Sequence, residues 1–158
     1  MPAAVLLAFI LPIPLGRPAP ARTDPQAWLT LEAAFRARGV AVVAHHPRCS
    51  EAGLFGLYVR GSRTVVVCPK GDRSETLRHE GWHLVQSLCL GGKPWLSPQQ
   101  VQTSLSRQDR RDLQQVVSVE RWWREAEARA MARMTLPNYL GELNRACGER
   151  LPPVASPM

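Results

Sequence analysis

The chain has 158 residues, a formal net charge of +7, and 18 Arg against only 2 Lys. This length suits one domain with a single modest core, and no internal repeat or low-complexity tract occurs. The basic residues are spread along the chain and alternate with acidic ones, which indicates a solvated surface rich in ion pairs. No zinc-finger, helix-turn-helix or aromatic-stacking pattern accompanies the charge, so we expect no nucleic-acid partner, whereas attraction to acidic polypeptides or anionic membranes stays open.

The N-terminal residues 1–21 have the character of a leader. Residues 3–15 form an apolar run that is too short and too interrupted by proline to span a bilayer, and Ala19-Pro20-Ala21 offers a cleavage site. We therefore predict a signal peptide, and a secreted or periplasmic protein without stable membrane insertion. Because no Lys or Arg occurs in the first 16 residues, a membrane tether formed by an uncleaved segment is the alternative.

Residues 22–151 are predicted to form a single domain, which starts with a helix, a strand and a hairpin. Residues 25–38 have the apolar spacing of an amphipathic helix that stops at Gly39, and residues 40–45 are typical of a buried strand. Residues 54–68 contain two β-branched or aromatic runs joined by Gly61-Ser62, which predicts a β-hairpin.

Residues 79–83 read His-Glu-Gly-Trp-His, an H-E-x-x-H motif within a segment that predicts a helix. His79 and His83 then lie one turn apart on the same face, so both imidazoles can reach one metal ion. Glu80 lies beside them as a proton acceptor. The motif predicts a Zn²⁺ site with His79 and His83 as ligands and Glu80 as the general base.

A catalytic zinc site needs a third protein ligand and an open position for water. Residues 107–134 predict a long helix that offers Glu120, Glu125 and Glu127. One stripe at three- and four-residue spacing contains Leu113, Val116, Glu120, Trp123, Glu127, Ala130 and Met134. This phase turns Glu120 and Glu127 toward the core and Glu125 toward solvent. A carboxylate on an apolar stripe is costly unless it is paired or metal-bound, so we favour Glu127 as the ligand, with Glu120 or an arginine salt bridge of Glu127 as alternatives.

The segment from Glu125 to Pro137 resembles the Glu-x-Glu-Ala segment of minimal gluzincin-like peptidases, including the ImmA/IrrE group. The resemblance covers residues from about Leu54 to Pro137. It implies an α+β, minimal zincin-like fold with an N-terminal helix, a small antiparallel sheet, and the H-E-x-x-H helix packed on a long Glu-bearing helix. It also implies that Glu127 completes the zinc site and that a hairpin edge receives a polypeptide substrate as an added strand.

The C-terminal part predicts a final helix from Asn138 to about Arg145 and a flexible tail at 152–158. A peptidase also needs a hydrogen-bond donor for the oxyanion. We assign this role to Tyr139, just past the Glu-bearing helix, with Tyr58 or His46 as alternatives.

The four cysteines are scattered among the predicted elements and lack the paired spacing of a structural zinc site. In an oxidising compartment they would form two disulfides, and we favour Cys49–Cys68 and Cys89–Cys147. The first pair would join the segment entering the hairpin to its exit strand, and the second would join the end of the motif helix to the last helix. In a cytosolic protein the same residues would be free buried thiols.

These patterns together predict a zinc-dependent peptidase that hydrolyses peptide bonds through a metal-activated water. Two alternatives stay open. The first is a catalytically weak zinc-binding interaction module, and the second is a basic binding protein in which the motif is accidental.

Overall fold

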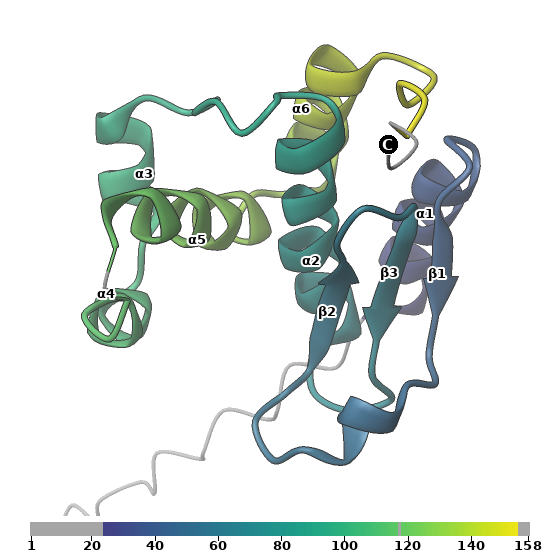
Figure 1. The fold of residues 1–158 in the computed structure, drawn as a ribbon, viewed down its shortest axis with the longest axis horizontal. Coiled ribbons are helices and arrows are strands. Elements are labelled where there is room, and N and C mark those ends of the chain that lie inside the picture. The colour runs from purple at the N-terminus through teal and green to yellow at the C-terminus, as the bar shows by residue number, and fades with distance from the viewer. Residues whose placement is uncertain (1–23, 117, 155–158) are drawn as a thin grey trace, which may run out of the picture.

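The computed structural model describes residues 24–116 and 118–154 (Figure 1). The predicted leader at 1–21 and the last four residues of the predicted tail lie outside the described residues. The fold is α+β, as predicted. Its elements are α1 (Pro25–Arg36), β1 (Ala41–Val43), the short 3-10 helix η1 (Pro47–Ser50), β2 (Gly56–Val59), β3 (Thr64–Val67), α2 (Arg73–Leu88), α3 (Pro98–Ser104), α4 (Arg107–Leu113), α5 (Val119–Ala132) and α6 (Leu136–Cys147).

The sheet has three strands in the order β1-β3-β2. The predicted hairpin is confirmed, because β2 and β3 pair antiparallel with Tyr58 opposite Val65. The sheet as a whole is mixed rather than antiparallel, since β1 pairs parallel with β3, with Val42 opposite Val65. Because β3 lies between β1 and β2, strand β2 is at an edge of the sheet. The outer side of β2 borders the site described below.

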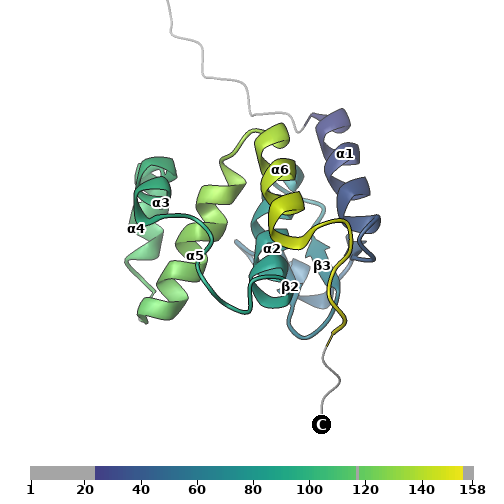
Figure 2. The same ribbon diagram turned by 90° about the horizontal axis from the view of Figure 1, so that it is seen from above.

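Helix α2, which carries the H-E-x-x-H motif, lies at the centre of the fold. It packs against β2 and β3, against α1 and α6, and against α5 (Figure 2). Its N-cap is Asp72, whose carboxylate accepts a hydrogen bond from the backbone N–H of Glu75. A Cβ on Gly81 would lie 2.2 Å from Cζ of Phe35, so a glycine in the middle of the motif allows α1 to pack closely on α2.

The core is one cluster that runs from α1 to the C-terminal segment. Its largest fully buried apolar side chains are Trp82, Tyr139, Phe35, Leu31, Leu77, Leu84, Leu113, Met131 and Leu143. Among the described residues, no helix is long and apolar enough to cross a membrane.

The helix predicted over residues 107–134 is in fact two helices, α4 and α5. The side chains of Ser106 and Ser118 each cap a helix N-terminus, and the chain changes direction between them. The predicted stripe from Leu113 to Met134 assumed one continuous helix, so it does not hold across this break. Helix α5 also lies between α2 on one side and α3 and α4 on the other (Figures 1 and 2), so it has no broad solvent face.

Both predicted disulfides are present in the structure. Cys49 is bonded to Cys68, and Cys89 is bonded to Cys147, so none of the four thiols is free. The first disulfide joins the η1 segment to the end of β3, and the second joins the C-cap of α2 to the last residue of α6.

Candidate metal centre

Three side chains from two helices converge on one point beside the edge of the sheet. Nε2 of His79 and Nε2 of His83, both on α2, each lie 3.2 Å from a carboxylate oxygen of Glu125 on α5. The potential ligand atoms of these three residues all lie within 4.8 Å of one another. This spacing allows one metal ion to contact two imidazole nitrogens and a carboxylate oxygen.

The position of Glu125 corrects the expectation that its side chain points to solvent. Its carboxylate is only 28% exposed and faces the two histidines, because the side of α5 that carries it packs on α2. Burial raises the pKa of the Glu125 carboxyl, but hydrogen bonds from His79 and His83 outweigh burial and hold the pKa well below its usual range. The carboxylate is therefore ionised, as a metal ligand must be.

The position of Glu127 corrects its assignment to the metal site. Glu127 is fully buried, but its carboxylate lies outside the His79, His83 and Glu125 cluster. It accepts four hydrogen bonds: from Nε1 of Trp82 at 2.9 Å, from Nε2 of Gln86 at 3.1 Å, and from the backbone N–H groups of Trp95 at 2.7 Å and Leu96 at 2.9 Å. All four donors are neutral, so the contacts of this carboxylate include neither the metal cluster nor the alternative arginine salt bridge.

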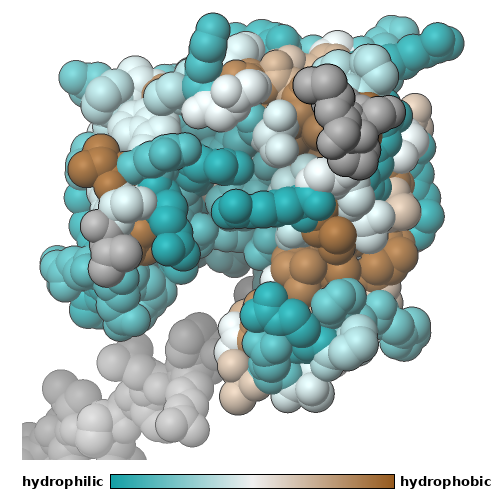
Figure 3. All heavy atoms as spheres, in the orientation of Figure 1, coloured by the Kyte–Doolittle hydropathy of each residue, from teal (hydrophilic) through white to brown (hydrophobic). Residues whose placement is uncertain are grey.

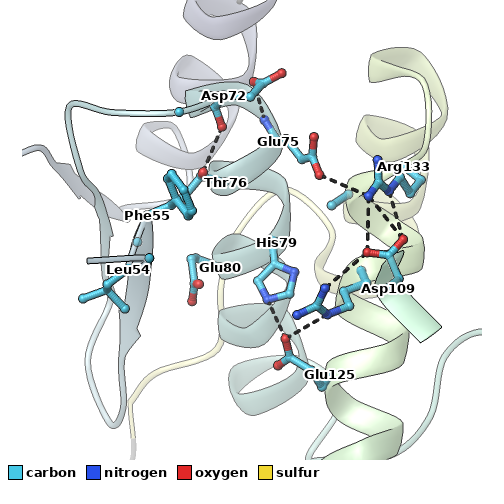
Figure 4. Close-up of a pocket in the computed structure, with 15 residues that line it drawn as sticks. Leu54, Phe55, Asp72, Glu75, Thr76, His79, Glu80, Asp109, Glu125 and Arg133 are labelled. Carbon is cyan, nitrogen blue, oxygen red and sulfur yellow. Dashed lines mark hydrogen bonds and ion pairs between the residues drawn. The ribbon is translucent and has the colours of Figure 1, made fainter. Parts of the chain in front are cut away.

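Glu80 lies next to the metal cluster and faces the cleft, as Figure 4 shows. Its Oε2 accepts a hydrogen bond of 3.0 Å from the backbone N–H of Tyr58 on β2. The close approach of β2 to α2 depends on Gly56, where a Cβ would lie 2.6 Å from Cγ2 of Thr76 and 3.2 Å from Cγ of Glu80. The sequence placed Glu80 beside the histidines, and the structure agrees.

Gln86 orients His83. The Gln86 amide donates through Nε2 to the carboxylate of Glu127 and to the backbone carbonyl of Arg124, so its Oε1 is left to accept from Nδ1 of His83 at 2.9 Å. In the neutral imidazole, which a metal requires, this contact leaves Nε2 of His83 with a lone pair. Burial lowers the pKa of His83, but the hydrogen bond and charge of Glu125 raise it more, and the net shift is upward.

A chain of ion pairs orients Glu125 from the other side. Nε of Arg129 lies 3.3 Å from Oε1 of Glu125, and its Nη1 lies 3.2 Å from Oδ1 of Asp109. Arg133 contacts Asp109 at 3.2 Å and Glu75 at 3.7 Å (Figure 4). Burial raises the pKa of Asp109, but hydrogen bonds, first from Ser106 and then from Arg133, lower it to about 2. Sequence reasoning missed this network because its members come from three separate helices.

Tyr139 is not placed to stabilise an oxyanion, which corrects that assignment. It is fully buried between Phe35 and Trp82, with ring centroids 6.4 and 6.0 Å away, and its hydroxyl donates to the carbonyl of Arg78 at 2.9 Å. Burial raises its pKa, so the phenol is neutral. Tyr139 is a core residue that secures α6 against the start of α2.

The other sequence alternatives also lie outside the metal cluster. Nδ1 of His46 accepts a hydrogen bond from the backbone N–H of Arg48 and caps η1. The hydroxyl of Tyr58 is buried and has no hydrogen-bond partner among the described residues. Glu120 is exposed in the first turn of α5, where it lines the cleft without joining the cluster.

The metal cluster lies in a cleft between β2 and α5, with α2 as its floor. The cleft consists of two adjoining cavities of about 430 and 870 Å³, which share His79, Glu80 and Glu125. Figure 3 shows this hollow from the outside, bordered mainly by hydrophilic side chains. A cleft that is open on both sides of the cluster can hold an extended chain whose middle lies at the metal centre.

Comparison with known protein families, curated proteins and solved structures found no match.

Proposed function

We propose that this protein is a zinc-dependent peptidase in which His79, His83 and Glu125 hold the metal and Glu80 is the general base. The observation that carries the proposal is the convergence of both Nε2 atoms of an H-E-x-x-H helix on the carboxylate of Glu125. Two imidazoles and one carboxylate are a donor set that catalytic zinc sites use, with a fourth position left for water.

The surroundings of the three side chains fit a metal site. Gln86 fixes the tautomer of His83, and Arg129 orients the carboxylate of Glu125. Such contacts to the outer atoms of ligands are typical of metal centres, where they set ring orientation and ligand charge. The low pKa of Glu125 keeps the carboxylate ionised across the physiological pH range.

The chemistry then depends on Glu80. Zinc bound at this site would supply a Lewis acid that polarises the peptide carbonyl and lowers the pKa of a water molecule. The carboxylate of Glu80 takes the proton from the attacking water and delivers it to the leaving amine. The hydrogen bond from Tyr58 N–H to Oε2 of Glu80 holds the carboxylate in place, and Oε1 is left for the proton transfer.

The edge of β2 supports a polypeptide as the substrate. The backbone N–H of Cys68 bonds to the carbonyl of Phe55, so by the alternation of an antiparallel pair the backbone groups of Gly56 and Tyr58 point away from β3. The N–H of Tyr58 is taken by Glu80, which leaves the carbonyl of Tyr58 and the backbone groups of Gly56 on this edge. An extended peptide can therefore add to this edge through backbone hydrogen bonds, and its side chains would occupy the two halves of the cleft.

Export to an oxidising compartment belongs to the same proposal. Both disulfides stabilise elements next to the metal helix, and such bonds persist outside the cytosol. A secreted or periplasmic peptidase is the form of the proposal that these bonds favour.

Metal analysis and a peptide-cleavage assay test the function together. Oxidised wild-type protein should bind about one zinc per chain and cleave peptides from a mixed library, detected by mass spectrometry. Glu125→Ala should lose both properties, whereas Glu80→Gln should keep zinc and lose cleavage. Glu32→Ala, which removes a half-buried carboxylate that pairs with Arg36 on α1, is the control and should keep both. Zinc binding without cleavage by the wild type would leave a zinc-binding module, and absence of zinc would overturn the proposal.

A further inference from the structure

The charges in the cleft are distributed unevenly on the two sides of the metal cluster. On the side of Phe55 and Thr76, the acidic residues Glu75 and Asp109 are paired with Arg129 and Arg133. With Asp72, this half has three carboxylates against two guanidiniums, so it has no excess of positive charge. It also presents Phe55, which is 47% exposed.

The other half of the cleft is basic. Apart from the metal cluster and Glu80, it is lined by four guanidinium groups and only one further carboxylate, that of Glu120. Arg48 is already paired with Glu51 at 2.7 Å. The side chains of Arg60, Arg121 and Arg124 form no hydrogen bond, ion pair or ring contact within residues 24–116 and 118–154.

These three arginines come from both walls of the cleft. Arg60 directly follows β2, and Arg121 and Arg124 lie one turn apart in the first half of α5. An extended chain that runs along β2 past Glu80 and Tyr58 would therefore pass between guanidiniums on its two sides. Unpaired guanidiniums next to a backbone-binding edge are suited to carboxylates, which arginine binds in a bidentate manner.

We propose that Arg60, Arg121 and Arg124 form a subsite for acidic side chains on one side of the cleaved bond, so that the preferred substrates are acidic peptides. The position of this subsite beside a cleaved bond rests on the proposed peptidase function, but the preference for binding acidic peptides does not. The net charge of +7 would add long-range attraction for acidic chains.

A peptide fits this half of the cleft better than a nucleic acid. The arginines share the cavity with the edge of β2, where the carbonyl of Tyr58 points away from β3. A carbonyl oxygen can accept a hydrogen bond from a peptide N–H, but a phosphate diester offers it no donor. Apart from the two histidines of the metal cluster, the cavity lining contains one aromatic side chain, Tyr58, which packs against the core. Stacking platforms of the kind that single-stranded nucleic acids use are therefore lacking there.

Binding measurements on the zinc-loaded Glu80→Gln protein test the subsite without loss of the peptide to cleavage. The probes are fluorescein-labelled Ala/Gly/Ser peptides of about ten residues, which is the length that an extended chain needs to fill both cavities. Each peptide carries several Glu, Gln or Lys residues in either its N-terminal or its C-terminal half. Fluorescence anisotropy should show about tenfold tighter binding of one Glu peptide than of its Gln counterpart, as a few exposed ion pairs provide. The preference should appear with Glu in one half only and should shrink at about 500 mM salt.

Charge-reversal variants connect this preference to the residues. In the Glu80→Gln protein, the double substitution Arg121→Glu/Arg124→Glu should abolish the preference for the Glu peptide. Arg60→Glu, on the opposite wall of the cleft, should weaken this preference. The matched control is Arg107→Glu/Arg150→Glu, which changes the net charge equally at two exposed positions outside the cleft and should keep the preference. Equal binding of Glu and Gln peptides, or equal losses in both double variants, would overturn the subsite.

The remaining outcomes are also decisive. If a single-stranded oligonucleotide of matched charge displaces the Glu peptide more effectively than unlabelled Glu peptide does, the surface binds nucleic acid and the proposal is wrong. Cleavage of library peptides by the wild type without any acidic preference would overturn the subsite and leave the peptidase. An arginine-dependent preference without cleavage would support the subsite and overturn the peptidase.

Discussion

Gln86 accepts a hydrogen bond from Nδ1 of His83, and this contact at 2.9 Å connects the candidate metal centre to the buried core of the protein. Through its Nε2, the same amide bonds to the carboxylate of Glu127, which in turn holds the backbone of the loop at Trp95. The orientation of His83 therefore depends on a carboxylate that lies outside the metal cluster.

Gln86→Ala should lower the affinity for zinc by about 10- to 100-fold, because His83 loses the acceptor that fixes its tautomer and ring orientation. Competition with a zinc-binding dye measures this change. The control is Gln99→Ala, at an exposed position of α3. Equal affinities in the two variants would show that Gln86 has no role in orienting the ligand.

Glu127→Gln should destabilise the fold without removing a metal ligand. The amide nitrogen of the new side chain would face some of the four donors that now bond to the carboxylate, and each unsatisfied buried group costs about 1–3 kcal/mol. Urea denaturation should show a lower free energy of unfolding, with Glu32→Gln as the control. The folded variant should still bind about one zinc, and complete loss of zinc from a folded protein would return Glu127 to the ligand set.

Gly81→Ala should lower the free energy of unfolding by about 1–3 kcal/mol, the usual cost of overpacking a core. Its methyl group would lie 2.2 Å from Cζ of Phe35, so α1 and α2 would have to separate. Gly141→Ala in α6 is the control, because a Cβ there meets nothing within 4 Å and should add up to about 1 kcal/mol of helix stability. Similar effects at the two positions would contradict the close packing of α1 on α2.

Asp109→Asn should change how stability depends on pH. The pKa of Asp109 is lowered from 3.8 to about 2 in the folded protein, so its contribution is fully present above pH 3.8 and is lost as the pH falls toward 2. The difference in unfolding free energy between wild type and variant should therefore be largest near neutral pH and narrow between pH 4 and 2. A difference that stays constant over this range would show that the contacts of Ser106 and Arg133 do not stabilise the ionised carboxylate of Asp109.

The features that the sequence predicted well are those set by local pattern. The H-E-x-x-H spacing places His79 and His83 on one face of any helix, and the hairpin follows from two β-branched runs around Gly61. The expectation that Glu125 points to solvent was wrong because it depended on how α5 packs. A single amphipathic phase assumes one buried face, whereas α5 is covered by α2 on one side and by α3 and α4 on the other, so both Glu125 and Glu127 point toward protein. Tyr139 was misassigned for a related reason, since closeness in sequence to α5 does not place it near the cleft.

The half-cystines Cys68 and Cys89 bracket α2, the first shortly before its N-cap and the second at its C-cap. The ends of this helix are thus tied covalently to the η1 segment and to α6, whether or not a metal is present. Small zinc domains without such bonds unfold when the metal is removed. Here a chelator should give an intact but inactive apoprotein, and added zinc should restore it without refolding. On the proposed function, an exported chain of this kind would fold without metal and would become active with the metal supply of the compartment that it enters.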